Sequence, residues 1–351
     1  MKYNLLLFTL FVFFIVVSGC RKEDPIIPPT GYYPRQLTQG GLDNWAFLSP
    51  DGKHIAFYSC RYTIDWEYPN GTLELWLMSN DGFNQLRVVP FNGIYPQTKA
   101  TFLFWADDSK SMFVQIDDGY NRTSKSEIWN ISIDGEKTKI YSPDLHMEKF
   151  RYSSDRKKIF YIVYDLEHAG PEYPGDLFYV SDADFSNRVQ IENPGNFSQP
   201  VWVDSENLIY SMYDRLNYNF DLWKCKFDGT DKLRLTETIE WEDYPNCSTD
   251  GKYLAYTIGN SVYLTATDKF SPKMIISSAI NPEWIPNRNL LSVETIHTDG
   301  NTSSWGPSLF INNEGVSIKE FPGGSSGFSF SSDGKYFVYT LDGNIWMDYL
   351  P

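Results

Sequence analysis

A short segment near the C-terminus has the residue spacing of a serine nucleophile. Residues 323–327 read GGSSG, which matches the G-x-S-x-G pattern of hydrolases, where a sharp turn exposes the serine hydroxyl for attack on an acyl group. Such a turn requires a strand before the serine and a helix after it. Here the alternating segment FSFS follows directly, which indicates a strand. We therefore interpret the segment as a glycine-rich loop and assign no catalytic residue.

Histidines and acidic residues are the candidates for metal ligands. The four histidines, His54, His146, His168 and His297, lie far apart in the sequence, and no CxxC pair accompanies them. The acidic run DDG at residues 117–119 lacks the alternating oxygen ligands of a calcium loop. We predict isolated, solvated histidines on loops, a structural role for His54, no metal site and no cofactor.

The elements that must position these residues repeat along the chain. LSPDGKHIAFYS at residues 48–59 returns as FSFSSDGKYFVYTL at residues 328–341. The shared pattern is an aromatic residue, a turn centred on Asp and an apolar run. Seven copies occur roughly 47 residues apart. Their anchor positions are Asp51, Asp108, Asp155, Asp204, Asp250, Asn287 and Asp333.

A second unit lies between successive anchors, for example LELWLMSNDGFNQLRVV at residues 73–89. Each unit reads as a strand, an Asp/Gly turn and another strand, so one repeat contains four antiparallel strands. Four-stranded repeats of this period are typical of β-propellers. The tetrapeptide Ser49-Pro50-Asp51-Gly52 resembles the repeat of TolB-type propellers, which also occurs in the propellers of prolyl-oligopeptidase-like enzymes.

The sequence therefore predicts an all-β fold, with a single β-propeller over residues 31–351. We expect seven blades, with six as the alternative because the spacing is irregular. The segment YYPRQLTQ at residues 32–39 resembles an outer strand without a blade of its own. We expect this N-terminal strand to complete the last blade and close the ring, which removes open sheet edges.

Antiparallel pairing assigns the connections to two faces. If the strands of a blade are lettered a to d from the axis outward, the a–b and c–d turns share one face, here called the short-turn face. The b–c and d–a connections share the opposite, long-loop face, where function usually resides because loops vary. The aromatic residues predicted for this face are Tyr62, Trp66, Tyr68, Tyr120, Tyr173, Tyr218 and Trp305 in b–c loops, and Tyr95, Trp241 and Tyr244 in d–a connections.

Acidic residues are expected beside these aromatic residues. They are Asp65, Glu67, Asp117, Asp118, Asp165, Glu167, Glu172, Glu240, Glu242 and Asp243. An aromatic, acidic face suits stacking on sugar rings or contact with a basic protein surface. The alternative is that these side chains pack the loops against themselves. The residues predicted to bind the ligand are Tyr62, Trp66, Tyr68, Tyr120, Tyr173, Trp241 and Trp305.

The N-terminus reads as an export signal. Residues 1–20, MKYNLLLFTLFVFFIVVSGC, contain an early lysine, an apolar run and the small pair Ser18-Gly19 before Cys20. The ending resembles the bacterial lipoprotein box, which implies lipidation of Cys20. A transmembrane anchor or an ordinary cleavable signal are the alternatives.

Residues 21–30, RKEDPIIPPT, read as a Pro-rich tether between this signal and the propeller. Arg21 follows the cysteine, where the inner-membrane retention signal prefers Asp, so we expect the outer membrane. The run Lys22-Glu23-Asp24 resembles the surface-export signal of Bacteroidetes lipoproteins, which favours display on the cell surface. The periplasmic face is the alternative.

Composition narrows the partners. The sequence has 45 Asp and Glu residues against 30 Lys and Arg residues, and this acidic balance disfavours binding to nucleic acid. Cys60, Cys225 and Cys247 are too scattered for a disulfide framework, so we expect apolar packing, with one disulfide as the alternative.

The sequence thus predicts a lipid-anchored, monomeric binding module for a protein or a glycan. The alternative is a propeller enzyme with a site at the axis, either a glycan hydrolase or a relative of the oligogalacturonate lyases, which resemble this repeat class and use a histidine-rich metal centre.

Overall fold

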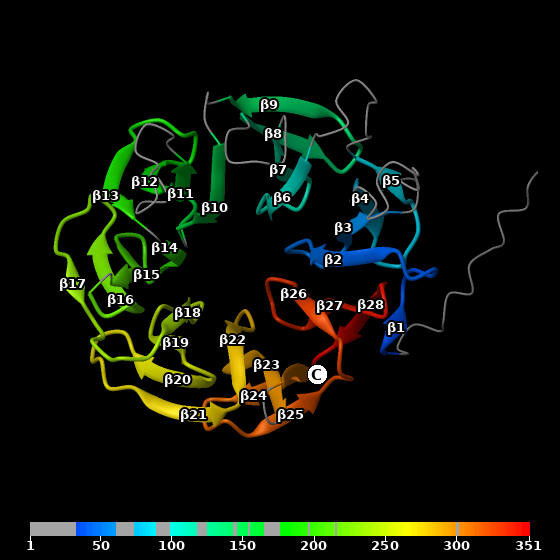
Figure 1. Ribbon diagram of the computed structural model, residues 1–351. Helices are drawn as coiled ribbons and strands as arrows, with labels where there is room; N and C mark the ends of the chain where they lie inside the picture. The colour runs from blue at the N-terminus through cyan, green and yellow to red at the C-terminus, as the bar shows by residue number, and fades with distance from the viewer. Residues whose placement is uncertain are drawn as a thin grey trace, which may run out of the picture. The chain divides into compact units, whose positions relative to one another are not determined.

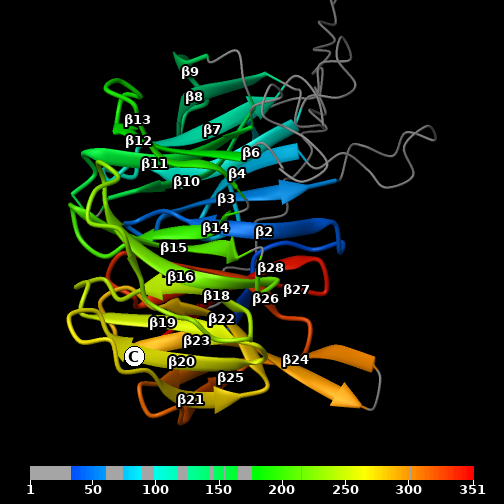
Figure 2. The same cartoon turned by 60° about the vertical axis from the view of Figure 1, so that its left-hand side comes forward.

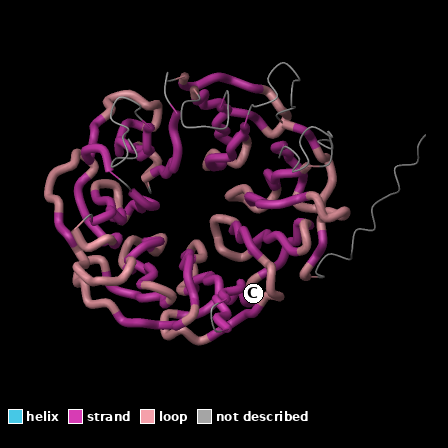
Figure 3. The backbone as a smooth tube through the Cα atoms, viewed as in Figure 1, coloured by secondary structure: helices cyan, strands magenta, loops and turns pink. Residues whose placement is uncertain are grey.

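The computed structural model describes residues 33–60, 74–88, 99–117, 125–142, 146–153, 155–164, 176–195, 197–214, 216–299 and 302–351. All of them belong to one compact unit, Tyr33–Pro351. Within these ranges the chain forms strands, turns and loops but no helix (Figure 3). Because these ranges contain no helix, they contain no helical membrane span.

The strands form seven antiparallel sheets of four, so the seven-bladed prediction is confirmed and the six-bladed alternative is wrong. Blade 1 contains β2 (Asp43–Leu48), β3 (His54–Ser59), β4 (Glu74–Ser79) and β5 (Leu86–Arg87). Blade 2 contains β6 (Lys99–Trp105), β7 (Ser111–Asp117), β8 (Ser126–Ser132) and β9 (Lys137–Tyr141). Blade 3 contains β10 (His146–Tyr152), β11 (Lys158–Tyr164), β12 (Asp176–Asp182) and β13 (Val189–Gly195). Blades 4 and 5 contain β14 (Phe197–Trp202), β15 (Asn207–Asp214), β16 (Asn219–Lys226) and β17 (Leu233–Arg234); β18 (Glu242–Cys247), β19 (Tyr253–Ile258), β20 (Ser261–Ala266) and β21 (Lys273–Ser277). Blades 6 and 7 contain β22 (Ala279–Trp284), β23 (Leu290–Asp299), β24 (Thr302–Asn312) and β25 (Ser317–Glu320); β26 (Ser326–Phe330), β27 (Tyr336–Leu341), β28 (Asn344–Tyr349) and β1 (Arg35–Gln36).

The blades surround a central axis, with the first strand of each blade innermost (Figure 1). The expected closure by the N-terminal strand is confirmed, because β1 forms the outer strand of blade 7. Arg35 pairs with Met347 and Gln36 with Trp346. The two ends of the propeller sequence are thereby joined in one sheet.

The recurring Asp-centred turn is built by side-chain hydrogen bonds. Ser49 Oγ donates to Asp51 Oδ1 at 2.7 Å and accepts from the His54 amide at 2.9 Å. Asp51 Oδ1 also accepts from the Lys53 amide at 3.0 Å. The same bonds recur at Ser153, Ser248 and Ser331 with their own aspartates. The repeated phrase is therefore a scaffold turn on the short-turn face.

The core lies between neighbouring blades. One cluster joins blades 3 and 4 through Phe160, Phe178, Tyr210 and Cys225, each fully or almost fully buried. Burying one such aromatic side chain stabilises the fold by about 1.5–3 kcal/mol. Cys225 packs in this apolar cluster, as expected from the sequence.

Candidate functional site

Most of the aromatic residues predicted for binding lie outside the described residues. These are Tyr62, Trp66, Tyr68, Tyr95, Tyr120 and Tyr173. Cys20 and His168 lie outside them as well. The structure places Trp241, Trp305, Tyr218 and Tyr244.

Trp305 lies in a strand. We expected it in a b–c loop, and this expectation is wrong. β23 continues to Asp299, β24 begins at Thr302, and Trp305 pairs with Ile296. Asp-Gly at residues 299–300 is a strong hairpin signal, so two strands can extend to the tip. Figure 2 shows this long hairpin projecting beyond the neighbouring strands. The Trp305 side chain remains 64% exposed.

Trp241 lies in the d–a connection before β18, as predicted, and belongs to a group of exposed apolar residues. Leu216 and Ile239 are each 89% exposed, Tyr218 is 74% exposed and Trp241 is 54% exposed. Leu216 and Tyr218 follow β15, whereas Ile239 and Trp241 precede β18, and both connections lie on the long-loop face. We call these four residues the blade 4 patch.

Hydrogen bonds hold the two loops of the blade 4 patch together. Asn219 Nδ2 donates to the carbonyl oxygen of Thr238 and, at 3.2 Å, to that of Glu240. The Trp241 ring lies against the Phe220 ring, with 5.3 Å between centroids. The patch therefore has a fixed base, and its exposed side chains do not need a partner to order the backbone beneath them.

An ion-pair network supports the same loops. Arg234 Nη2 lies 2.9 Å from Asp214 Oδ2 and 2.5 Å from Asp221 Oδ2, and Arg234 Nε donates to the Thr236 carbonyl. Asp214 also accepts from the Leu216 amide at 2.8 Å. Because Asp221 is fully buried, its carboxylate needs this guanidinium close by.

Glu242 lies beneath the patch and is fully buried, which corrects its assignment to the exposed acidic residues. Burial raises the pKa of Glu242 to about 7, the bond donated by Thr238 opposes this, and Asp221 adds to it. Burial likewise raises the pKa of Asp221, against the effect of Arg234. Asp243 is half-buried and accepts from Ser211 Oγ at 2.8 Å.

Asp117 was also assigned to the exposed acidic residues, and it is buried instead. Ser126 Oγ and Gln115 Nε2 donate to its Oδ1 at 2.6 and 2.7 Å. His146 Nδ1 lies 3.7 Å from the same oxygen, and its side chain is largely buried at the start of β10, which corrects its assignment to a solvated loop. Ser126 donates to the aspartate rather than to the histidine, so the three do not form a serine–histidine relay.

The remaining residues that the sequence singled out lie in loops and strands of the scaffold. The glycine-rich segment stays a loop up to Ser325, which is buried, and the next residue begins β26. His54 begins β3, and His297 is exposed in β23. Tyr244, expected in a connection, lies in β18 and is half-buried. In the ranges that the structure describes, no three His, Cys, Asp or Glu side chains are grouped so that they could hold a metal ion.

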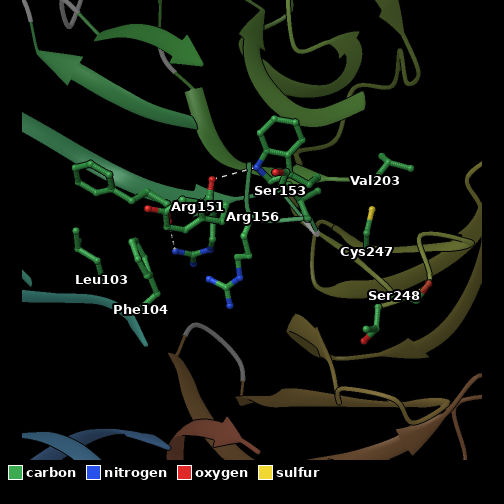
Figure 4. A pocket seen from close by; sticks show the side chains of 13 residues that line it. Leu103, Phe104, Arg151, Ser153, Arg156, Val203, Cys247 and Ser248 are labelled. Atoms are coloured by element: carbon green, nitrogen blue, oxygen red, sulfur yellow. Dashed lines mark hydrogen bonds between the residues drawn. The ribbon is translucent and has the colours of Figure 1, made fainter. Parts of the chain in front are cut away.

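A cavity of about 510 Å³ lies at the axis, toward the short-turn face, and was not anticipated from the sequence. It is lined by the ends of β6, β10, β14 and β18 and by the turns that follow them (Figure 4). Its charged lining residues are Arg151 and Arg156. A second cavity of about 250 Å³ shares Arg151 and adds Lys149.

β-Bulges position the residues of the axis. The pairing of every inner strand with its neighbour shifts register once, and Arg151, Val201 and Asn246 are the first paired residues after three of these shifts. A bulge re-aims the side chains next to it, and bulges are common at the rims of closed sheets. The strict alternation expected of a strand is broken at these positions, which explains why periodicity could not assign them.

Opposite charges face each other across the axis. Arg151 belongs to blade 3, and Glu283 belongs to blade 6 on the other side (Figure 1). Both side chains are exposed to the solvent inside the ring of blades. The protein around this space nevertheless raises the pKa of Glu283 to about 7 by burial. Arg151 opposes this shift, and Glu294 adds to it.

The sequence matches no protein-family model and no curated protein. The fold resembles solved structures. An oligogalacturonate lyase in complex with manganese is 13% identical, with a TM-score of 0.68 over 90% of this chain and 92% of that one. TolB from Acinetobacter baumannii is 15% identical, with a TM-score of 0.51 over 78% of this chain and 64% of that one. A puromycin-hydrolyzing peptidase from Mycobacterium tuberculosis is 10% identical, with a TM-score of 0.61 over 83% of this chain and 46% of that one.

At these identities the likeness extends to the fold alone. The chain is a seven-bladed β-propeller, and its structural neighbours include TolB-like propellers. It spans 64% of the TolB structure and 46% of the peptidase structure. The neighbours include both enzymes and TolB-like proteins, so function has to be argued from the surfaces described above.

Proposed function

We propose that this protein is a lipid-anchored binding module of the bacterial envelope and that the blade 4 patch docks a protein partner. The observation that carries the proposal is the exposure of two aliphatic and two aromatic side chains on adjoining loops. Exposed apolar groups of this kind, on a base already fixed by hydrogen bonds, are typical of interaction sites.

The composition of the blade 4 patch favours a protein over a glycan. Sugars stack on flat aromatic rings, whereas Leu216 and Ile239 are aliphatic and are the most exposed members of the patch. Protein interfaces combine an apolar centre with a polar rim. Glu237 and Glu240 are exposed beside Ile239 and supply an acidic rim, which fits a partner with basic residues around an apolar centre.

The envelope location rests on the sequence. An apolar run that ends in Ser-Gly-Cys supports export and lipidation of Cys20, and the tether supports a propeller held away from the bilayer. A lipid anchor would keep the patch near other envelope proteins and raise their effective concentration.

The test is capture of a partner from the envelope of cells that make the protein. Ile239→Lys places a charge in the patch, and Ile318→Lys is the matched control because Ile318 is 55% exposed on the outer strand β25. We expect one discrete partner that wild type and Ile318→Lys capture equally and that Ile239→Lys loses by at least tenfold, about 1.4 kcal/mol.

Capture should also weaken as salt rises, because the acidic rim is screened. Equal capture by Ile239→Lys and Ile318→Lys would show that the patch is not the docking surface. Failure of the wild type to capture any envelope protein would also count against the proposal.

A further inference from the structure

The axial cavity near the short-turn face is positively charged in an acidic protein. The whole chain has a formal net charge of −15. Yet the residues that line the cavity of about 510 Å³ include two arginines and, in the described part of the chain, no carboxylate. Figure 4 shows the Arg151 and Arg156 side chains extending into the space that the lining residues surround. Two arginines in the lining of a cavity indicate that it could bind an anionic ligand.

Arg151 has unused hydrogen-bonding capacity. Among the described residues, its guanidinium donates to one acceptor, the neighbouring carbonyl oxygen of Phe150, at 2.9 Å. Its electrostatic counterpart, Glu283, lies across the axis in blade 6. Arg151 is exposed to the solvent inside the ring, so its remaining guanidinium N–H groups are accessible to a ligand.

Arg156 is already partly neutralised. Its Nε lies 3.1 Å from Asp107 Oδ1 in the neighbouring blade, and its guanidinium lies over the Tyr152 ring, 5.5 Å from the centroid. With Arg156 matched by Asp107, the positive charge left in the cavity is that of Arg151, and Glu283, which offsets this charge from across the axis, does not line the cavity. One spare charge suits a monoanion, and the planar fork of arginine matches a carboxylate.

The walls of the cavity are apolar and aromatic. They consist of Leu103, Phe104, Phe150, Tyr152, Val201, Trp202 and Val203, with Ser and Thr groups at the turns. The walls are also fixed in place. Phe104 and Tyr152 pack edge to face at 4.4 Å, and Trp202 Nε1 donates to the Arg151 carbonyl at 3.1 Å. Pockets of about 300–1,000 Å³ with apolar walls and a few polar groups are typical of small-molecule sites.

We propose that this cavity binds a small organic monoanion, a carboxylate with an aromatic or branched apolar body, with Arg151 holding the carboxylate and the walls from β6, β10 and β14 enclosing the body. The site is separate from the blade 4 patch, since the cavity lies toward the short-turn face and the patch on the long-loop face. Either proposal can therefore fail without the other.

The test is titration calorimetry of the full-length protein in mild detergent, with 3-phenylpropionate as the probe. Two matched compounds separate the parts of the proposal: 3-phenylpropionamide keeps the body without the charge, and acetate keeps the charge without the body. We expect 3-phenylpropionate to bind with a dissociation constant below about 1 mM, and both matched compounds to bind at least tenfold more weakly.

Variants then show which arginine binds the carboxylate of the probe. Arg151→Gln should weaken binding of 3-phenylpropionate at least tenfold, and Arg151→Lys should restore part of it, because the charge returns without the planar fork. Arg156→Gln should cause a smaller loss. Arg188→Gln is the control, because Arg188 stacks on the outer Tyr179 ring, 4.5 Å from its centroid, away from the cavity. Each variant is checked for an unchanged melting temperature.

Three results would overturn the proposal: no binding of 3-phenylpropionate to the wild type, equal binding of its amide, or unchanged binding to Arg151→Gln. The amide comparison uses the wild-type protein alone, so the claim stays testable even if a variant folds poorly.

Discussion

The buried carboxyl of Glu242 predicts that stability falls as pH rises through the neutral range. Its pKa is about 7 in the folded protein against 4.5 for an ordinary glutamate. Between these values the folded state binds more protons than the unfolded state, so stability is fully present below pH 4.5 and is lost as pH rises toward 7. Glu283, with a pKa also raised to about 7, acts in the same direction.

Glu242→Gln removes the charge while keeping the shape. The Gln oxygen can still accept from Thr238. A difference from 4.5 to about 7 is worth at most ~3 kcal/mol. The effective dielectric constant of proteins, which is high even at buried sites, reduces this value, and we expect about 1–2 kcal/mol above pH 7. For a domain of this size that corresponds to a rise in Tm of about 2–3 °C.

The assay is thermal unfolding of wild type, Glu242→Gln and Glu240→Gln between pH 5 and pH 8. Glu240 is the control because it lies in the same loop with an exposed side chain. We expect Glu242→Gln to differ least from wild type near pH 5, to exceed it most at pH 8 and to show a shallower fall of Tm with pH. A Glu242→Gln variant that is less stable than wild type at pH 8, or whose Tm falls with pH as steeply as that of Glu240→Gln, would refute a role of the buried carboxyl in this pH dependence.

Two further predictions concern the scaffold and the anchor. Gly251 has φ +69°, and an added Cβ would lie 2.2 Å from the Val203 carbonyl oxygen of the preceding blade, so Gly251→Ala should destabilise the propeller by about 2–4 kcal/mol. Gly323→Ala, where a Cβ meets nothing within 4 Å, should change Tm little; equal losses in denaturant titrations would contradict this account of the turn. Cys20→Ala should abolish incorporation of an alkyne-labelled fatty acid that the wild type acquires, and labelling that persists would rule out Cys20 as the lipidated residue.

The architecture could be predicted because its information is local. Each blade needs the same turn, and Ser49 and Asp51 build that turn from hydrogen bonds within a few residues of sequence. Ring closure could also be predicted, because an outer strand without a blade had to pair with a blade without an outer strand. The exposure of Trp241 followed from its place in a connection on the long-loop face.

The axial cavity could not be predicted, because its residues are aimed by bulges that break the alternation of the inner strands. Arg151 stands in a segment, KFRY, that reads as an ordinary strand, and the direction of its side chain depends on the register shift before it. The one available signal was an arginine in an innermost strand. Burial of Glu242 and Asp117 was missed for a similar reason, since both stand at strand ends, where adjoining connections and strands cover them.

The central claim, docking of a protein on the blade 4 patch, is tested most directly by site-specific photo-crosslinking in cells that make the protein. A photoreactive phenylalanine analogue is placed at position 239 in the patch or at position 318 on the outer strand β25. We expect one discrete adduct with an envelope protein from position 239 and none from position 318. No adduct from position 239, or the same adduct from both positions, would contradict it.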